Sequence, residues 1–377
     1  MQNNEIFKTP GQLLSSLLAE RDWSNRLLSS VTGLEETGIS RLLTDKKSIT
    51  AEVAVILEEV FSVSAERFLN LQKSYDLAKA RITVMPDSKR AIRAQLLGAL
   101  PIQEMIARSW IKVKNQKDVQ EIELELTKFF NTSNLEEIEQ LPHSAKKTNP
   151  DSSVSLLQLS WLFRVTQIAK ELITPKYSEE KTISALPKLK ALLVSPEEAR
   201  KVPKILNECG IKFVIVEALK SSKIDGVCCW LNQDSPVIAM TLRFDRMDNF
   251  WFVLRHELEH VLQRHGMVAP IIDADSAFEE NKNITISEEE QIANDAASEF
   301  CAPQAKILSF IARKAPIFPE RDFLGLAKII GVHPSIVAGQ IRFKTNRFEL
   351  FGSHNAKIRN CILPSAIVDG WGDIAPV

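Results

Sequence analysis

The stretch Trp251-Phe-Val-Leu-Arg-His-Glu-Leu-Glu-His-Val-Leu-Gln-Arg-His265 contains an H-E-x-x-H motif, and the rest of the chain is interpreted from it. Its apolar residues recur at helical spacing, which predicts an amphipathic helix. On a helix, His256 and His260 lie one turn apart on the same face, and Glu257 follows the first of them. This arrangement is typical of a catalytic zinc site in which the glutamate takes a proton from water. The alternative is a solvated helix face that carries two ordinary histidines.

The position of a third ligand decides which class of metalloprotease the motif would indicate. The metzincin pattern needs a glycine at position 263 and a histidine at position 266, so Gln263 and Gly266 exclude that class. His265 is close in sequence, but helical geometry places it about 140° around the axis from His260. We therefore expect His265 to point away from the metal.

A more suitable third ligand lies in the segment 287–303. Ser287 is a favourable helix N-cap, and Glu290 stands at the capping-box position three residues later. Glu290 and Asn294 share one helix face, so the carboxylate can bind zinc while the amide orients a ligand histidine. The alternative is that the glutamates at the start of this helix only interact favourably with the positive end of the helix dipole. We prefer this alternative for Glu288 and Glu289.

An H-E-x-x-H helix is thus followed by an E-x-x-A-N helix that ends near a proline. The residues concerned are His256, Glu257, His260, Glu290, Ala293, Asn294 and Pro303. In this combination the segment 243–303 resembles the ImmA/IrrE family of zinc metallopeptidases. Glu259 and Ala296 depart from the family's usual glycine and phenylalanine, and Glu259 adds negative charge beside the site. The resemblance implies a gluzincin-like peptidase with one zinc per chain that cleaves a regulatory protein.

Composition places the chain among ordinary globular proteins. Its 377 residues suffice for two or three domains, and 45% hydrophobic and 25% charged residues are usual for a soluble protein. The net charge of −1 gives no global attraction to nucleic acid. No apolar run approaches the roughly 20 residues that span a bilayer, and the start lacks a signal-peptide pattern. We therefore expect no membrane contact. Since the five cysteines lack zinc-finger spacing, we expect a reduced, cytoplasmic protein.

Residues 9–80 show the pattern of five short helices with a glycine-bearing turn at Gly33, which is the helix-turn-helix layout. The third helix, over about 35–43, is the predicted recognition helix. Its outward residues would face the major groove, and two lysines beyond it would meet phosphate. These residues are Glu36, Thr37, Ser40, Arg41, Lys46 and Lys47. Acidic residues balance basic ones over 1–80, so the alternative is a five-helix packing module that does not bind DNA.

The same segment carries several more specific motifs. They are Thr9-Pro-Gly-Gln-Leu-Leu14, Trp23-Ser24, Thr32-Gly-Leu34, Ile39-Ser-Arg-Leu-Leu43, Lys46-Lys-Ser-Ile-Thr50 and Phe68-Leu-Asn-Leu-Gln-Lys-Ser-Tyr-Asp76. Together they resemble HigA-type antitoxins, a branch of the Xre/Cro helix-turn-helix regulators. The resemblance implies operator DNA as a partner, binding as a homodimer, and for some relatives a small toxin as a second partner.

Between these regions the composition and the periodicity of the sequence change. Residues 81–200 have helical periodicity, interrupted over 141–153 by a stretch with the composition of an exposed linker, where His143 lies. From position 210 onward, β-rich runs cover 211–216, 226–231 and 236–242. They predict a small sheet packed against the motif helix. We expect 238–243 to be an edge strand that can pair with an extended substrate peptide.

The expected fold is therefore mainly α with a small β-sheet (α+β). We predict a five-helix helix-turn-helix domain over 1–80, a helical connector over 81–200, a peptidase domain over 201–345 and a C-terminal tail over 346–377. The expected function is a DNA-binding regulator or antitoxin whose zinc peptidase domain cleaves a regulatory protein. The alternative is an antitoxin or repressor whose peptidase-like domain binds metal or a partner without significant proteolysis.

Overall fold

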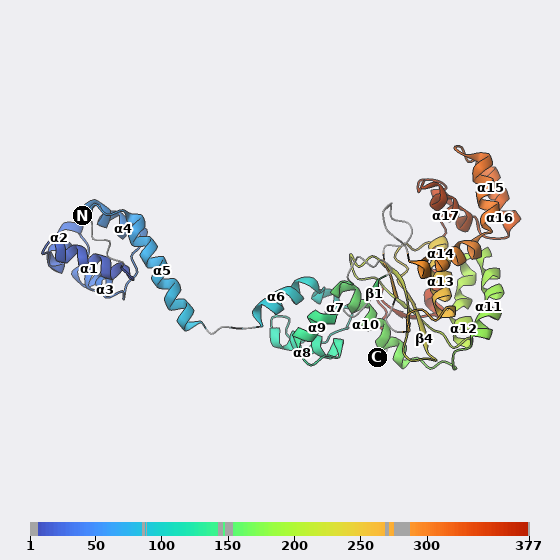
Figure 1. The fold of residues 1–377 in the computed structure, drawn as a ribbon, viewed down its shortest axis with the longest axis horizontal. Coiled ribbons are helices and arrows are strands. Elements are labelled where there is room, and N and C mark those ends of the chain that lie inside the picture. Colours follow the sequence, from blue (N-terminus) through green and yellow to red (C-terminus); the bar gives the residue numbers. More distant parts are fainter. Residues whose placement is uncertain are drawn as a thin grey trace. The chain divides into compact units, whose positions relative to one another are not determined.

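The computed structural model describes residues 7–84, 87, 89–141, 146–147, 154–267, 271–274 and 287–375. The chain divides into two compact units, Met1–Lys89 and Arg90–Val377. Figure 1 draws the first in blue and the second in cyan to red. Helices make up most of the described residues and one small sheet lies in the second unit, so the predicted fold class is confirmed.

The first unit consists of the five helices predicted from the sequence. They are α1 (Pro10–Glu20), α2 (Asn25–Thr32), α3 (Glu36–Leu43), α4 (Ala51–Phe61) and α5 (Ala65–Thr83). Four of them begin at a side chain whose oxygen accepts a backbone N–H, namely Thr9, Ser24, Thr50 and Ser64. These caps satisfy amide groups that a helix start leaves without an intrahelical partner. The turn between α2 and α3 runs through Gly33, whose φ of 72° favours glycine.

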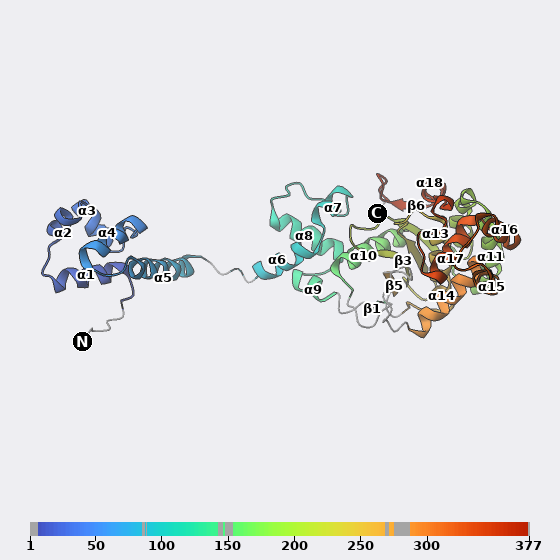
Figure 2. The same ribbon diagram turned by 90° about the horizontal axis from the view of Figure 1, so that it is seen from above.

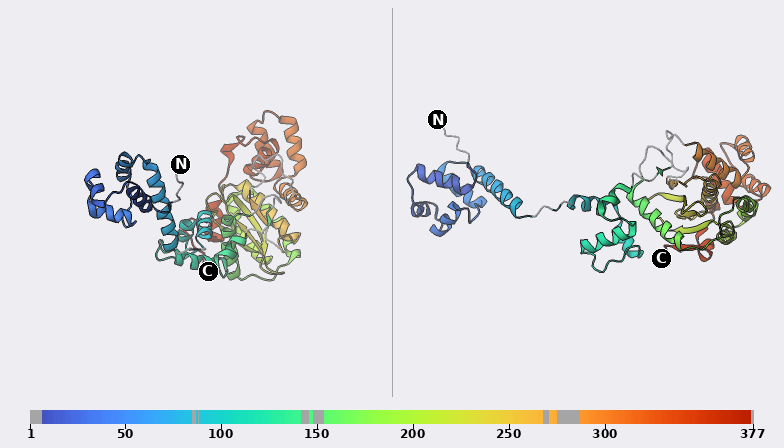
Figure 3. Two further views of the ribbon diagram at one scale, coloured as in Figure 1. Left: turned by 60° about the vertical axis from the view of Figure 1, so that its left-hand side comes forward. Right: turned by 60° about the horizontal axis from the view of Figure 1, so that its bottom comes forward.

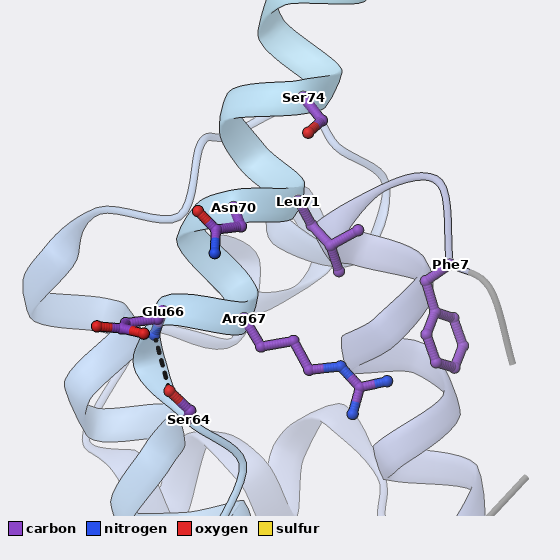
Figure 4. Close-up of a pocket in the computed structure, with 7 residues that line it drawn as sticks. All are labelled: Phe7, Ser64, Glu66, Arg67, Asn70, Leu71 and Ser74. Atoms are coloured by element: carbon purple, nitrogen blue, oxygen red, sulfur yellow. Dashed lines mark hydrogen bonds between the residues drawn. The ribbon is translucent and has the colours of Figure 1, made fainter. Parts of the chain in front are cut away.

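A shallow groove of about 480 Å³ lies beside the start of α5 (Figure 4). Its lining residues are Phe7, Ser64, Glu66, Arg67, Asn70, Leu71 and Ser74. The Arg67 guanidinium lies 5.9 Å from the centroid of the Phe7 ring. The lining includes none of the residues that the sequence predicts as DNA contacts, so the groove is a separate surface of this unit.

The second unit contains the sheet and the remaining helices. Its first helices are α6 (Arg90–Ala99), α7 (Ile102–Ala107), α8 (Val119–Phe130), α9 (Leu135–Gln140), α10 (Leu156–Glu171), α11 (Glu179–Ala191) and α12 (Val202–Glu208). After three strands follow α13 (Met247–Leu262), α14 (Glu288–Cys301), α15 (Gln304–Lys314), α16 (Glu320–Ile330), α17 (Pro334–Thr345) and α18 (Arg359–Ile362). Of the described helices, none is alone long and apolar enough to cross a membrane; α16 and α17 reach that length jointly, across a 113° bend.

The sheet has the strand order β1-β5-β3-β4-β2-β6. Its strands are β1 (Lys146–Lys147), β2 (Lys212–Val216), β3 (Ile224–Trp230), β4 (Pro236–Met240), β5 (Ile271–Ala274) and β6 (Ile367–Asp369). Ile238 in β4 is paired on one side with Cys228 of β3 and on the other with Phe213 of β2. The prediction that 238–243 forms an edge strand is therefore wrong, because both sides of β4 are already occupied.

Each face of the sheet contributes to a different hydrophobic core. Ile238 and Met240 belong to a core shared with α11–α14 and α17, whereas Val237 and Ala239 belong to a core shared with α6–α10. This division follows from the alternation of side chains along a strand. Figures 1 and 2 show α10 and α13 on opposite sides of the sheet, and Figure 3 shows the same layers from two further directions. The motif helix α13 thus lies against one face only.

The segments that the sequence separates as connector and tail meet in the same unit. Strand β6 pairs in parallel with β2. Asp369, at the end of β6, accepts hydrogen bonds from the Trp110 indole (2.9 Å) and from Arg164 Nε (2.8 Å). All three side chains are buried. A buried carboxylate requires such partners, so residues near positions 110, 164 and 369 are fixed to one another.

Candidate functional site

Helix α13 is buried on every side. All residues from Met247 to Val261 are buried, whereas the apolar spacing predicted an amphipathic helix. The prediction was wrong because the sheet, α14 and α17 surround this helix together. Gly226 in β3 permits the close approach, since a Cβ there would lie 2.6 Å from Glu257 Oε1 and 2.8 Å from Val253 Cγ1. The motif is therefore held in the protein interior.

Helix α14 brings the predicted third ligand to α13. The Ser287 hydroxyl accepts the Glu290 N–H at 3.3 Å, so the helix begins where its N-cap predicted. Ala293 and Ala297 are fully buried in this helix. Small residues let two helices pack closely, which places Glu290 next to the histidines of α13.

Three potential ligand atoms converge at this helix pair. His256 Nε2 and His260 Nε2 lie 3.0 Å apart, and the Glu290 carboxylate oxygens lie 3.2 Å and 3.4 Å from them. Two ligands of a tetrahedral zinc ion, each about 2.0–2.1 Å from the metal, are separated by about 3.3 Å. Side-chain type, burial and spacing of the trio of His256, His260 and Glu290 therefore all fit a metal ion.

The electrostatic state of the trio also suits a cation. Burial alone would raise the pKa of Glu290, but hydrogen bonds with His256 and His260 outweigh it and lower that pKa to about 2. Burial lowers the pKa of His260, which favours its neutral form. A carboxylate and neutral imidazoles are the forms that bind metal.

Asn294 lies where the sequence placed it, one turn after Glu290 on α14. Its Oδ1 atom is 3.1 Å from His256 Nδ1. Because an amide oxygen only accepts, His256 Nδ1 is the donor in this contact, and Nε2 lies on the side of the ring that faces the trio. Asn294 thereby orients the first histidine.

The two other glutamates of the motif helix differ in their surroundings. Glu257 is fully buried beside β3. Glu259 pairs with Arg255 at 2.6 Å and accepts a hydrogen bond from Gln263. Burial alone would raise the pKa of Glu259, but these hydrogen bonds outweigh it and lower the pKa. The charge of Glu259 beside the trio is thus balanced by Arg255.

His265 is not one of the trio, but its ring faces His260 instead of pointing away as predicted. Its Nδ1 atom lies 3.0 Å from Nδ1 of His260, on the side of that ring opposite to the trio. The projection of 100° per residue was wrong here because α13 ends at Leu262. Arg264 and Gly266 then adopt φ angles of 56° and 76°, which turn the chain back toward the helix. A glycine four residues after the helix end was the sequence signal that could have revealed this turn.

The predicted DNA contacts lie in and just after α3 of the first unit. All six are exposed: Glu36, Thr37, Ser40, Arg41, Lys46 and Lys47. The opposite side of α3 contributes Ile39 and Leu42 to the core. The helix therefore presents a polar surface while its apolar residues hold it in the unit.

The first unit is similar to known proteins. No protein-family model matches the chain. Over 75 residues, 20% of this chain, it is 36% identical to "Uncharacterized HTH-type transcriptional regulator YddM" of Escherichia coli strain K12, 80% of which is covered. Through its N-terminal region the chain belongs to the helix-turn-helix-type transcriptional regulators.

A solved structure is also similar to this helix-turn-helix region. It is described as an addiction module antidote protein of a HigA family from Coxiella burnetii, and it is 28% identical. The match covers 21% of this chain and 95% of that one, with a TM-score of 0.18. The similarity to the regulator covers 20% of this chain, so the candidate metal site of His256, His260 and Glu290 rests on its own residues and geometry.

Proposed function

We propose that the chain is a DNA-binding transcription regulator of a toxin–antitoxin type, and that its second unit is a zinc-dependent peptidase acting on a regulatory protein. The observation that carries the peptidase half is the convergence of His256, His260 and Glu290 within 3.0–3.4 Å in a buried helix pair. Membership of the helix-turn-helix regulators supports the DNA-binding half.

In this proposal the trio holds one zinc ion per chain, and Asn294 fixes the ring of His256. Zinc bound there would polarise a scissile carbonyl and make water more acidic. Glu257, which follows His256 on α13, would accept the proton from that water and deliver it to the leaving amine. Its burial next to β3 excludes bulk water from the carboxylate, which strengthens its electrostatic interactions.

The exposed side of α3 would contact operator DNA. Thr37, Ser40 and Arg41 would reach base edges in the major groove, and Lys46 and Lys47 would meet phosphates. Two copies of the chain, bound as a homodimer, would recognise a two-fold symmetric operator. The motifs shared with HigA-type antitoxins support a small toxin as a further partner in the cytoplasm.

A second candidate function is metal or partner binding without significant turnover. The complete burial of Glu257 and His260 favours it, because a substrate peptide has to reach the metal before any bond is cleaved. In that case the second unit would sense a signal or bind a protein, and the helix-turn-helix unit would remain the effector.

The two candidates are separated by Glu257→Gln, which removes the base and leaves all three ligands in place. We would express wild type, Glu257→Gln and the control Glu289→Gln in a host that lacks the chromosomal copy. Glu289 is exposed in the first turn of α14, so its variant makes the same charge change outside the site. New protein N-termini would be labelled and identified by mass spectrometry, and zinc would be measured in each purified protein.

For a peptidase, a set of new N-termini appears with wild type and Glu289→Gln and is absent with Glu257→Gln, while zinc content is equal in all three. Identical N-termini in the three strains, with zinc retained, would establish the binding-only function. Absence of zinc from the wild-type protein would contradict the metal assignment itself.

A further inference from the structure

We propose that His265 is a positioning residue of the metal centre: it accepts a hydrogen bond from His260 and thereby fixes which nitrogen His260 presents to the metal. The inference rests on the proposed zinc site and extends it to a residue outside the H-E-x-x-H and E-x-x-A-N motifs.

His260 and His265 face each other through their Nδ1 atoms. The two Nδ1 atoms lie 3.0 Å apart, and the ring planes are inclined by 55°. His260 Nε2, on the other side of the same ring, lies 3.0 Å from His256 Nε2 and 3.4 Å from Glu290. The two nitrogens of His260 therefore face different partners, Nδ1 facing His265 and Nε2 facing the trio. An imidazole that binds metal through Nε2 carries its proton on Nδ1, so His260 donates and His265 accepts.

Hydrogen bonds of its own backbone hold His265 in this place. The Trp230 indole N–H donates to the His265 carbonyl at 2.9 Å, and the His265 N–H donates to the His260 carbonyl at 2.8 Å. Gly266 lies so close to β3 that a Cβ there would be 2.8 Å from the Cys228 carbonyl oxygen. Its φ of 76° also favours glycine. The turn after α13 is thus anchored to the strand that also faces Glu257.

The other histidine of the trio has a matching partner. Asn294 of α14 binds Nδ1 of His256, and His265 after α13 binds Nδ1 of His260. Each ligand ring therefore has its own acceptor, supplied by a different element. Partners of this kind fix the tautomer and orientation of ligand histidines, and their loss typically lowers metal affinity about 10–100-fold.

The test is the zinc affinity of the full chain, measured by competition with a chromogenic chelator. The variants are His265→Ala, which removes the acceptor, and His265→Asn, whose Oδ1 occupies the same position along the side chain as Nδ1. His354→Ala serves as the matched control, because His354 pairs with Glu320 at 2.6 Å and lies outside the trio. The absorption spectrum of the cobalt-substituted proteins reports the ligand field independently of affinity.

We expect His265→Ala to bind zinc about 10–100-fold more weakly than wild type and to change the cobalt spectrum. His265→Asn should restore both to near wild-type values, and His354→Ala should alter neither. Trp230→Phe, which removes the donor to the His265 carbonyl, should lower affinity in the same direction as His265→Ala by a smaller factor.

Three outcomes would overturn the inference. His265→Ala with wild-type zinc affinity shows that His260 needs no partner. His265→Asn as weak as His265→Ala shows that the ring acts by packing, since restoring an acceptor restores nothing. Failure of wild-type protein to bind zinc would overturn the proposed zinc site together with this inference, whereas the first two outcomes leave that site standing.

Discussion

The two units keep their candidate functional residues in opposite surroundings. In the first unit, six polar residues in and after α3 are exposed, and the core lies behind them. In the second unit, His256, Glu257, His260 and Glu290 are at most 2% exposed and come from two helices that long-range packing brings together. A change on the first surface should alter binding without altering the fold. A change in the second centre should affect metal binding and local stability together.

The largest expected effect is the loss of metal from His260→Ala. Two remaining ligands hold zinc poorly, so affinity should fall roughly a thousandfold and zinc should drop from about one per chain to a trace after dialysis. Elemental analysis measures this directly. The same variant should bind operator DNA as wild type does, which would confine the effect to the second unit. Full retention of zinc would show that the metal does not depend on His260, and the contrast between a buried metal site and an exposed DNA surface would fail.

Arg41→Ala tests the exposed surface. Loss of a base contact should weaken specific operator binding by about 1–3 kcal/mol and change non-specific binding less. Lys46→Ala should weaken both alike and reduce the salt-dependence slope by about one. Gel-shift titrations of the full chain over a range of salt concentrations measure both, and zinc content should stay unchanged. If wild-type protein fails to bind its own promoter even at low salt, the helix-turn-helix surface is not a DNA contact.

Gly226→Ala should disturb the buried centre without touching a ligand. The added Cβ would lie 2.6 Å from Glu257 Oε1 and 2.8 Å from Val253 Cγ1, so α13 or β3 has to shift. Overpacking of this kind costs about 1–3 kcal/mol. Thermal unfolding should show a lower midpoint for the second unit, and Gly325→Ala, where a Cβ has no neighbour within 4 Å, is the control. Equal midpoints would show that the contact between β3 and α13 is looser than the structure indicates.

The smallest expected effect is that of Ser24→Ala in the first unit. The Ser24 hydroxyl accepts the Leu27 N–H at 3.2 Å, and removing such a cap costs about 1 kcal/mol. Ser30 lies later in α2 and donates to the Arg26 carbonyl, so Ser30→Ala is the matched control and should cost less. Calorimetry should show a shift in the first unit alone. A shift in the second unit's transition would contradict the division of the chain into two units.

Local signals explain why the first unit was predictable in detail. Each of Thr9, Ser24, Thr50 and Ser64 caps a helix that starts within one residue of it, and Gly33 closes the turn. Such signals involve residues at most four positions apart, so a single sequence contains them. In the second unit, local signals predicted two elements. Apolar residues at helical spacing predicted the motif helix, and Ser287 predicted the start of α14.

Long-range packing explains what the sequence could not provide. The three strands predicted over 211–242 exist, but β4 was misplaced at an edge, because their sequence does not show that β2 pairs with β4 on the side opposite to β3. His265 was misplaced because its position follows from the end of α13 and from the hydrogen bond of Trp230. The convergence of His256, His260 and Glu290 was predictable because the spacing of the two motifs places each side chain on a defined helix face. The further partner of His260 was not, because a histidine beyond a helix end has no fixed direction.

The hydrogen bonds that Trp110 and Arg164 donate to Asp369 have a consequence for synthesis on the ribosome. The first unit is complete once residue 89 has emerged, whereas the second lacks β6 and the partner of Arg164 until Asp369 is made. At 5–20 residues per second, the 280 residues from 89 to 369 take roughly 15–60 seconds. For that interval a nascent chain carries a complete helix-turn-helix unit and a second unit that still lacks its strand β6. The helix-turn-helix unit can therefore fold before the unit that contains His256, His260 and Glu290.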